Sequence, residues 1–200
     1  DSMGGNQSIL GYEFVTEGRW LRTARIFDEV WIENHPIAEL PEMISHLAAG
    51  TLGVDIFTCS QPLTLLEKQY EYTTTMDNFA VAETTDYDAW AASMSQAARK
   101  NFRRAARRGV KVGIVEFDEK LVEGIKQIYD ETPFRQGRRF PHFRKSLEKV
   151  RAENSTYLDR AIFVGAHFEG ELIGFFKMVM IGTIARIMQI VSKDAYTDKR

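Results

Sequence analysis

The chain has 200 residues, 44% of them apolar and 27% charged, a composition typical of soluble globular proteins and enough for one large or two small domains. Its single cysteine, Cys59, excludes an internal disulfide framework and a cysteine-rich zinc site, which favours a reducing, cytoplasmic location. No apolar run reaches the ~18 residues that a transmembrane helix needs, so no membrane-spanning segment is predicted.

The charges are divided unevenly along the chain. Residues 1–92 carry 4 Lys/Arg and 15 Asp/Glu, a net charge of −11, whereas residues 93–200 carry 22 and 13, a net charge of +9. This asymmetry predicts two domains, 1–92 and 93–200, of which the second meets something anionic: a phosphorylated cofactor, a nucleic acid or a lipid headgroup. Alternatively, the two halves neutralise each other across an interface.

The first half predicts mostly strands. Alternating residues, or residues rich in Tyr, Thr and Val, predict strands at 10–15, 20–26, 28–33, 52–57, 70–75 and 78–82. Glu17-Gly18 lies between the first two strands and predicts a hairpin turn. Apolar residues at helical spacing over 37–47 predict a helix, with Pro41 in its first turn and Gly50 after its end.

The segment 93–109 predicts one helix, which Ser95 caps and Gly109 ends. Its apolar residues recur at i, i+4 and i+7 and predict a narrow inward stripe: Ala98, Phe102 and Ala105. Six outward cations form two rows: Arg99, Arg103 and Arg107, and Lys100, Arg104 and Arg108. Like charges four residues apart repel by a few tenths of a kcal/mol per pair, so a counter-anion is expected, either protein or ligand. Arg103 and Arg107 are the predicted ligand-binding residues of this helix.

The rest of the second half predicts the order β-α-α-β-β-β. The predicted elements are a strand at 110–117, helices at 118–131 and 143–153, and strands at 160–168, 172–181 and 183–191. Asp118 caps the first of these helices, and Pro133 ends it. Glu169-Gly170 and Gly182 predict the two hairpin turns between the last three strands.

The loop between the two helices is the second candidate site. It packs three arginines, a glutamine, a histidine and two phenylalanines into 131–142. Arg135, Gln136 and Arg138 are predicted to bind a carboxylate or phosphate of a substrate, with Gly137 permitting a turn of positive φ. Glu131 and His142 are the predicted proton-transfer residues. The alternative is an ordinary turn with a cationic surface.

Several chemistries are excluded by the motifs that the chain lacks. It has no G-x-x-x-x-G-K-[ST] or G-x-G-x-x-G phosphate-binding motif and no G-x-S-x-G nucleophile elbow. Its four histidines are scattered, so no metal site is predicted.

Two stretches carry a resemblance to a known superfamily. The β-α-α-β-β-β order over 110–191, with Glu169-Gly170-Glu171-Leu172-Ile173-Gly174-Phe175 inside it, resembles the GNAT acyltransferases, in which an acidic-Gly turn precedes an apolar pair, a glycine and an aromatic residue. The segment 95–110 resembles the basic helix that opens the second domain in the FemABX branch, which fuses two GNAT-like domains. Residues 194–200 contain no glycine-rich turn, and such turns are often missing in that branch.

The resemblance implies a fold and a function. The fold is α/β (α+β), a mixed, mainly antiparallel sheet flanked by helices, in tandem GNAT-like domains of which the second is truncated before its last helix and strand. The function is N-acyl transfer to a small-molecule or peptide amine, with acyl-CoA as the donor or aminoacyl-tRNA as the alternative. The implied cofactor-binding residues are Ile190, Val191, Ser192, Lys199 and Arg200, with a polarising backbone amide near 190–192.

Two other functions stay open. One is a non-catalytic module that binds nucleic acid, such as tRNA, or an anionic surface through helix 95–108. The other is a GNAT-like scaffold without catalysis that serves protein interaction. A homodimer is also expected.

Overall fold

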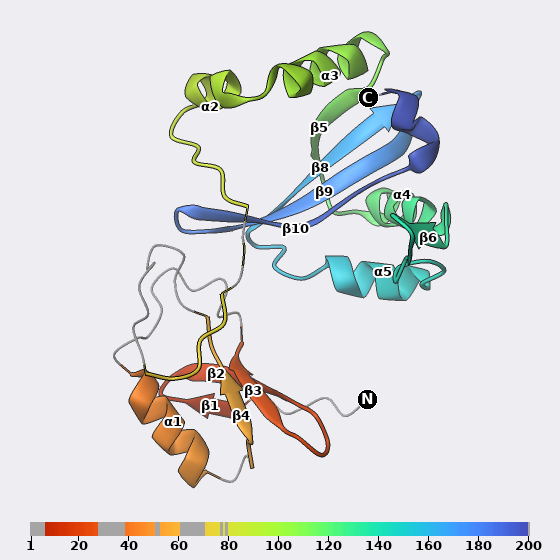
Figure 1. The fold of residues 1–200 in the computed structure, drawn as a ribbon. Helices are drawn as coiled ribbons and strands as arrows, with labels where there is room; N and C mark the ends of the chain where they lie inside the picture. The colour runs from red at the N-terminus through yellow and green to blue at the C-terminus, as the bar shows by residue number, and fades with distance from the viewer. Residues whose placement is uncertain are drawn as a thin grey trace. The chain divides into compact units, whose positions relative to one another are not determined.

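The computed structural model describes residues 7–27, 39–50, 53–60, 71–76, 78 and 80–199. The chain forms two compact units, Asp1–Asn78 and Phe79–Arg200 (Figure 1). Residue 92, after which the charge pattern predicts a domain boundary, lies within helix α2 (Tyr87–Ser93) of the second unit. The described residues contain five α-helices and mostly antiparallel sheets, which confirms the α+β class.

Unit 1 is a four-stranded sheet with one helix, and its strand order is β1-β2-β3-β4. Its elements are β1 (Gln7–Ile9), β2 (Tyr12–Glu17), β3 (Thr23–Ile26), α1 (Leu40–Ala49) and β4 (Ile56–Thr58). The predicted hairpin is confirmed as β2–β3, and its turn needs glycine because a Cβ on Gly18 would lie 2.0 Å from the Leu21 carbonyl oxygen. The predicted helix is confirmed as α1. Its buried residues pack on Phe14 and Ile26 of the sheet.

Four of the strands predicted in this half differ in the structure or lie outside the described residues. The strand at 52–57 is shorter and later, as β4, and pairs in parallel with β3. The strands at 70–75 and 78–82 are wrong, because the described residues of these ranges are exposed and form no strand. Their Tyr and Thr content raises β propensity, but propensity reflects a packed surface that these residues lack. The strand at 28–33 lies outside the described residues.

Unit 2 is built on a second four-stranded sheet, in the order β10-β9-β8-β5, with every neighbouring pair antiparallel. Its strands are β5 (Lys111–Val115), β8 (Ala161–Phe168), β9 (Glu171–Ile181) and β10 (Ile184–Ser192). Helices α4 (Glu119–Asp130) and α5 (Leu147–Asn154) lie between β5 and β8 in the chain. The β-α-α-β-β-β order is therefore confirmed. The loop between the helices adds a small hairpin, β6 (Phe134–Arg135) and β7 (Arg138–Arg139), and a 3-10 helix η2 (Asp194–Lys199) follows β10.

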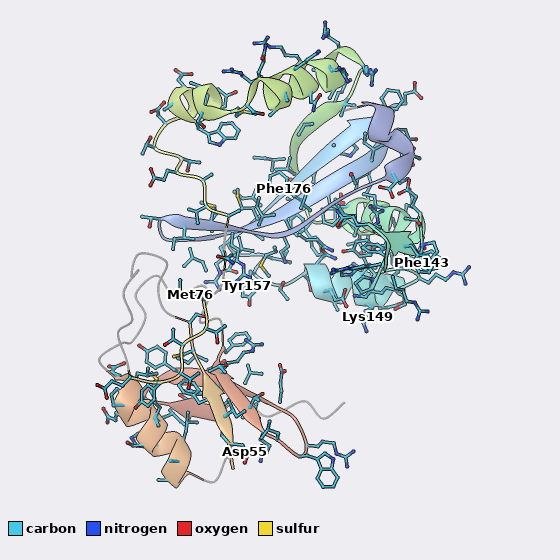
Figure 2. All side chains as sticks on the ribbon, viewed as in Figure 1. Asp55, Met76, Phe143, Lys149, Tyr157 and Phe176 are labelled. Atoms are coloured by element: carbon cyan, nitrogen blue, oxygen red, sulfur yellow. The ribbon has the colours of Figure 1, made fainter. Side chains whose placement is uncertain are left out.

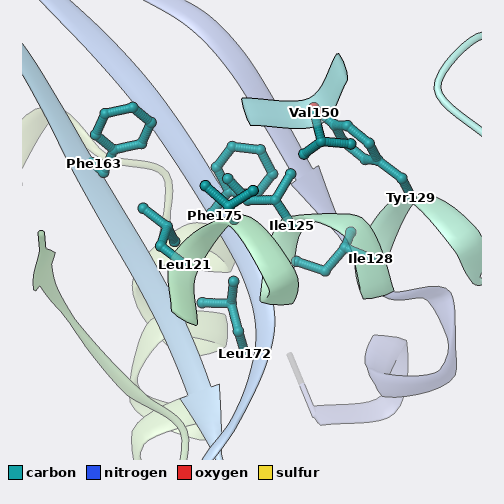
Figure 3. Close-up of a cluster of buried hydrophobic side chains, with 9 residues drawn as sticks. Leu121, Ile125, Ile128, Tyr129, Val150, Phe163, Leu172 and Phe175 are labelled. Atoms are coloured by element: carbon teal, nitrogen blue, oxygen red, sulfur yellow. The ribbon is translucent and has the colours of Figure 1, made fainter. Parts of the chain in front are cut away.

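Helix α4 supplies most of the core of unit 2. Asp118 caps its start by accepting a hydrogen bond from the Leu121 N–H at 2.8 Å. Figure 3 shows the cluster that α4 forms with α5 and the strands: Leu121, Ile125, Ile128, Tyr129, Val150, Phe163, Leu172 and Phe175. A Cβ on Gly124 would lie 2.8 Å from Leu172 Cδ2, so this glycine sets how closely the helix approaches the sheet. Both helices thus cover the same face of the sheet.

The opposite face of this sheet is apolar and largely open among the described residues. The strand register places one residue from each strand in a row across it: Ile114, Val164, Phe176 and Ile190. Ile114 and Ile190, at the two ends of this row, are 78% and 72% exposed. Figure 2 shows Phe176 on the side of the sheet away from Phe143 and Lys149.

The predicted basic helix is confirmed as α3 (Gln96–Arg107), and the separate helix α2 precedes it, with Met94-Ser95 between the two. The predicted caps are confirmed: Ser95 Oγ accepts from the Ala98 N–H, and Gly109 has a φ of +90°. The predicted burial of the stripe is wrong. Phe102 is 65% exposed, and no residue of α3 is buried. Two alanines and one phenylalanine give too narrow an apolar surface to hold a helix with six cations against the sheet. No described helix has the length and apolarity needed to cross a membrane.

Candidate functional site

The loop 131–142 is an ordered hairpin rather than an open loop. Gln136 and Gly137 occupy the turn between β6 and β7, with φ values of +52° and +74°. Two positive φ angles in a two-residue turn match the right-handed twist of the flanking strands, and the positive φ predicted for Gly137 is confirmed. Gln136 and Arg138 are exposed at this turn, whereas Arg135 is directed into the protein.

Arg135 and Glu131 join three segments of unit 2. The guanidinium donates to the Ser192 carbonyl oxygen at 2.6 Å, to the Ile128 carbonyl oxygen at 3.1 Å and to Glu131 Oε2 at 3.2 Å. It also lies 4.7 Å above the centre of the Phe140 ring. The side chains of Arg135 and Glu131 are only 16% and 17% exposed. Arg135 therefore links α4 and the hairpin to the end of β10.

The Glu131 carboxylate is occupied by the protein. Besides Arg135, it accepts hydrogen bonds from the backbone N–H groups of Asp194 at 2.7 Å and Ala195 at 2.9 Å. These contacts hold η2 against the end of α4. Glu131 and Arg135, predicted for proton transfer and substrate binding, thus lie together with Ser192 in one cluster that positions the end of β10.

Strand β10 forms one edge of the sheet, and its backbone alternates between the neighbouring strand and the open side. The Lys193 N–H bonds the Ile173 carbonyl oxygen across the ladder at 2.8 Å. In an antiparallel pair, the residues at alternate positions direct their N–H and C=O groups away from the partner strand. Ser192 is such a residue, in agreement with the contact that Arg135 makes to its carbonyl oxygen. Ile190 is the next one, so its N–H points to the open edge.

The second predicted proton-transfer residue, His142, lines a cavity of about 350 Å³ next to β10. The polar residues around this cavity are His142, Lys145, Glu153, Asn154, Thr156, Lys177 and Gln189. They come from the segment before α5, the end of α5, and the strands β9 and β10. The cavity thus lies on the helix-covered side of the sheet, beside the open edge of β10.

A chain of hydrogen bonds runs around His142. Lys145 Nζ lies 3.0 Å from His142 Nδ1 and donates to both Glu153 carboxylate oxygens at 2.6 Å. On the other side of the ring, His142 Nε2 lies 3.5 Å from Gln189 Nε2. Gln189 Oε1 accepts from the Tyr129 hydroxyl at 2.8 Å, and the Tyr129 ring packs on the His142 ring. Burial, and secondly the Lys145 ammonium, lower the pKa of His142, so the ring is neutral at neutral pH.

Lys177 also lines the cavity, and it is only 2% exposed. Its ammonium donates to the carbonyl oxygens of Asn154 and Thr156 at 2.9 and 2.5 Å and to Thr156 Oγ1 at 2.8 Å. It therefore caps the C-terminal end of α5, where carbonyl groups lack helical partners. Burial lowers the pKa of Lys177 to about 8. The sequence does carry a signal for this residue, because strand alternation places Lys177 on the same face as Phe175 and Val179.

The two ligand-binding residues predicted on α3 have no described contact with the residues around the His142 cavity. Arg103 and Arg107 are exposed, and within the described residues of unit 2 no acidic side chain forms an ion pair with any cation of α3. The described contacts of unit 2 therefore supply no counter-anion for this helix. Lys199 belongs to η2, but its side chain and Arg200 lie outside the described residues.

The described residues contain no group of three or more His, Cys, Asp or Glu side chains that could hold a metal ion. The chain matches no protein-family model, and no curated protein matches its sequence significantly.

Proposed function

We propose that the chain is an N-acyltransferase of the GNAT-like, FemABX-like kind. The observation that carries this proposal is the open edge of β10 at Ile190, one residue from Gln189, whose side chain lines the His142 cavity. A backbone N–H that faces the edge of the sheet, with no partner strand among the described residues, lies beside this open cavity. It offers what acyl transfer needs: a donor that polarises the acyl carbonyl, and a place for the acceptor next to it. The antiparallel sheet with two helices on one face supports the proposal, because the resemblance implies a mainly antiparallel sheet flanked by helices.

In the proposed reaction, a neutral amine attacks the carbonyl carbon of a thioester. The C–N bond forms as the C–S bond breaks, the thiolate leaves, and the proton lost from nitrogen passes through water to the solvent or to the thiolate. The Ile190 N–H stabilises the charge on the carbonyl oxygen, and the Arg135–Glu131 cluster holds the end of β10 in place. An aminoacyl ester of tRNA reacts in the same way, with a hydroxyl as the leaving group.

Replacement of Ile190 by proline tests this function, because it removes the one N–H on which the proposal rests. Proline is tolerated on edge strands where the N–H faces outward, so the fold is expected to persist. The test measures the release of free thiol from acetyl-CoA, and the loss of aminoacyl-tRNA, with a panel of primary amines. We expect the proline variant to lose about 10²–10³-fold in kcat, as for other lost oxyanion donors.

The matched control is Ile190→Val, which keeps the N–H and is expected to keep the activity. Absence of transfer by the unmodified chain with every donor and amine would reject the function. Equal activity in the proline and valine variants would reject the role of the Ile190 N–H.

Nucleic-acid binding by α3 is the second candidate function, and the absence of ion pairs between its cations and the described acidic side chains of unit 2 favours it. The exposed helix presents Arg103 and Arg107 on one row, at a spacing that suits successive phosphates. We expect the double variant Arg103→Ala/Arg107→Ala to bind a short DNA duplex more weakly. Its plot of log K against log salt should be shallower by ~2, because each phosphate contact contributes about 0.9. Lys120→Ala/Lys149→Ala removes two exposed cations from α4 and α5 as the control, and an equal loss there would show a non-specific charge effect.

A further inference from the structure

The hydrogen-bond partners of His142 determine which of its nitrogens carries the proton. Lys145 Nζ is 3.0 Å from Nδ1 and is paired with Glu153, so it is an ammonium group, which has donors and no acceptor. The other group near Nδ1, Glu153 Oε2, lies at 3.6 Å, beyond hydrogen-bond distance. Nδ1 therefore accepts from the closer Lys145 ammonium, and in the neutral ring the proton is on Nε2. His142 thus presents an N–H donor to the cavity rather than a basic lone pair.

Gln189 presents a second donor beside the first. Its Oε1 accepts from the Tyr129 hydroxyl, which leaves the Nε2 amide group directed at His142. The two nitrogens, 3.5 Å apart, are both donors and cannot satisfy each other. An oxygen atom at the usual distance of about 2.9 Å from each nitrogen fits between them. Two neutral N–H groups therefore converge on one point.

The cations around the cavity do not turn this point into an anion site. Lys145 is neutralised by both oxygens of Glu153, and the three protons of Lys177 are taken by Asn154 and Thr156. What is left to interact with a ligand is the neutral pair of N–H donors. A neutral carbonyl oxygen suits this pair better than a carboxylate, which would bring a charge that no free cation balances.

We propose that His142 Nε2–H and Gln189 Nε2–H bind the carbonyl oxygen of an amine acceptor that carries an amide group, such as the N-terminal residue of a peptide. This inference rests on the proposed function and adds the chemical class of the acceptor. The volume of about 350 Å³ accommodates a group of that size. Gln189 precedes Ile190 in β10, so an amine next to the bound carbonyl lies close to the donor edge of the strand.

Acetamide and acetate test the oxygen site without any catalysis. Each is titrated into the full chain while the ¹⁵N–¹H signals of His142 Nε2 and the Gln189 side chain are recorded. Acetamide is expected to shift both signals and acetate to bind more weakly. In His142→Phe, which keeps a ring against Tyr129, and in Gln189→Glu, which keeps the acceptor for the Tyr129 hydroxyl, acetamide binding should fall about tenfold. Lys120→Ala, at an exposed position of α4, is the control and should bind acetamide as the unmodified chain does.

Kinetics then test the acceptor class. Glycinamide is expected to have a KM about tenfold below that of glycine, and both variants should remove this difference. Tighter binding of acetate than of acetamide, or equal acetamide binding by the variants, would overturn the inference even where transfer is active. If no transfer is found, the proposed function fails, and the acetamide titration still decides whether the oxygen site exists.

Discussion

Replacing Ile125 by alanine is expected to lower the free energy of unfolding of unit 2 by about 2–5 kcal/mol. Ile125 is 0% exposed and lies in the middle of α4, within the cluster that also holds Phe163 and Phe175. Truncation removes three carbons from a packed site, and the neighbours relax only partly. Gly124, which is already in close contact with Leu172, leaves the helix little room to move inward. Urea denaturation followed by far-UV circular dichroism measures the loss.

Glu123→Ala is the matched control, because Glu123 is an exposed residue of the same helix. An exposed substitution of this kind usually changes stability by less than about 0.5 kcal/mol. A loss below about 1 kcal/mol for Ile125→Ala would contradict the packing of α4 on the sheet.

Arg135→Ala is expected to lower the free energy of unfolding by about 3 kcal/mol. This is a large effect for arginine, which is usually a surface residue. The guanidinium satisfies the carbonyl oxygens of Ser192 and Ile128 and pairs with Glu131. Its removal leaves these acceptors without their donor in a largely buried place, and losing one partner of a buried ion pair costs about 3–5 kcal/mol. The lower figure applies because both side chains keep some contact with solvent. Thermal or urea unfolding of the full chain measures the effect.

Two further variants separate this role from a general charge effect. Arg138→Ala, in the same hairpin, removes an exposed cation and should change stability by less than about 0.5 kcal/mol. Arg135→Lys should restore only part of the loss, because a lysine cannot present the planar fork that reaches three acceptors. If Arg135→Ala and Arg138→Ala were equally mild, Arg135 would not hold the end of β10.

Local signals in the sequence are enough to predict several elements of the fold. The spacing of apolar residues, a capping aspartate and Pro133 predict α4 with an error of one residue at each end. The two glycine turns likewise predict the meander of β8, β9 and β10. These signals succeed because the residues that form each element also determine where it begins and ends.

Contacts between distant residues explain where sequence reasoning fell short. The pairing of Tyr129 with Gln189 joins residues 60 positions apart, and that of Arg135 with Ser192 joins residues 57 apart. No periodicity carries such information. For the same reason, Arg135 resembles a substrate ligand in the sequence and contacts its own protein in the structure. The prediction that the stripe with Phe102 is buried was wrong for a different reason. Helical spacing predicts that a helix has an apolar face, but it does not show whether another surface covers that face.

The Glu131 carboxylate has a consequence for hydrogen exchange. Asp194 and Ala195 are exposed residues after the last strand, and backbone amides at such places usually exchange with solvent rapidly. Both amides donate to Glu131, which is anchored at the end of α4. These amides can therefore exchange only when their hydrogen bonds to the Glu131 carboxylate break. Two amides at the surface will thus report on the opening of a helix end that lies more than sixty residues earlier in the chain.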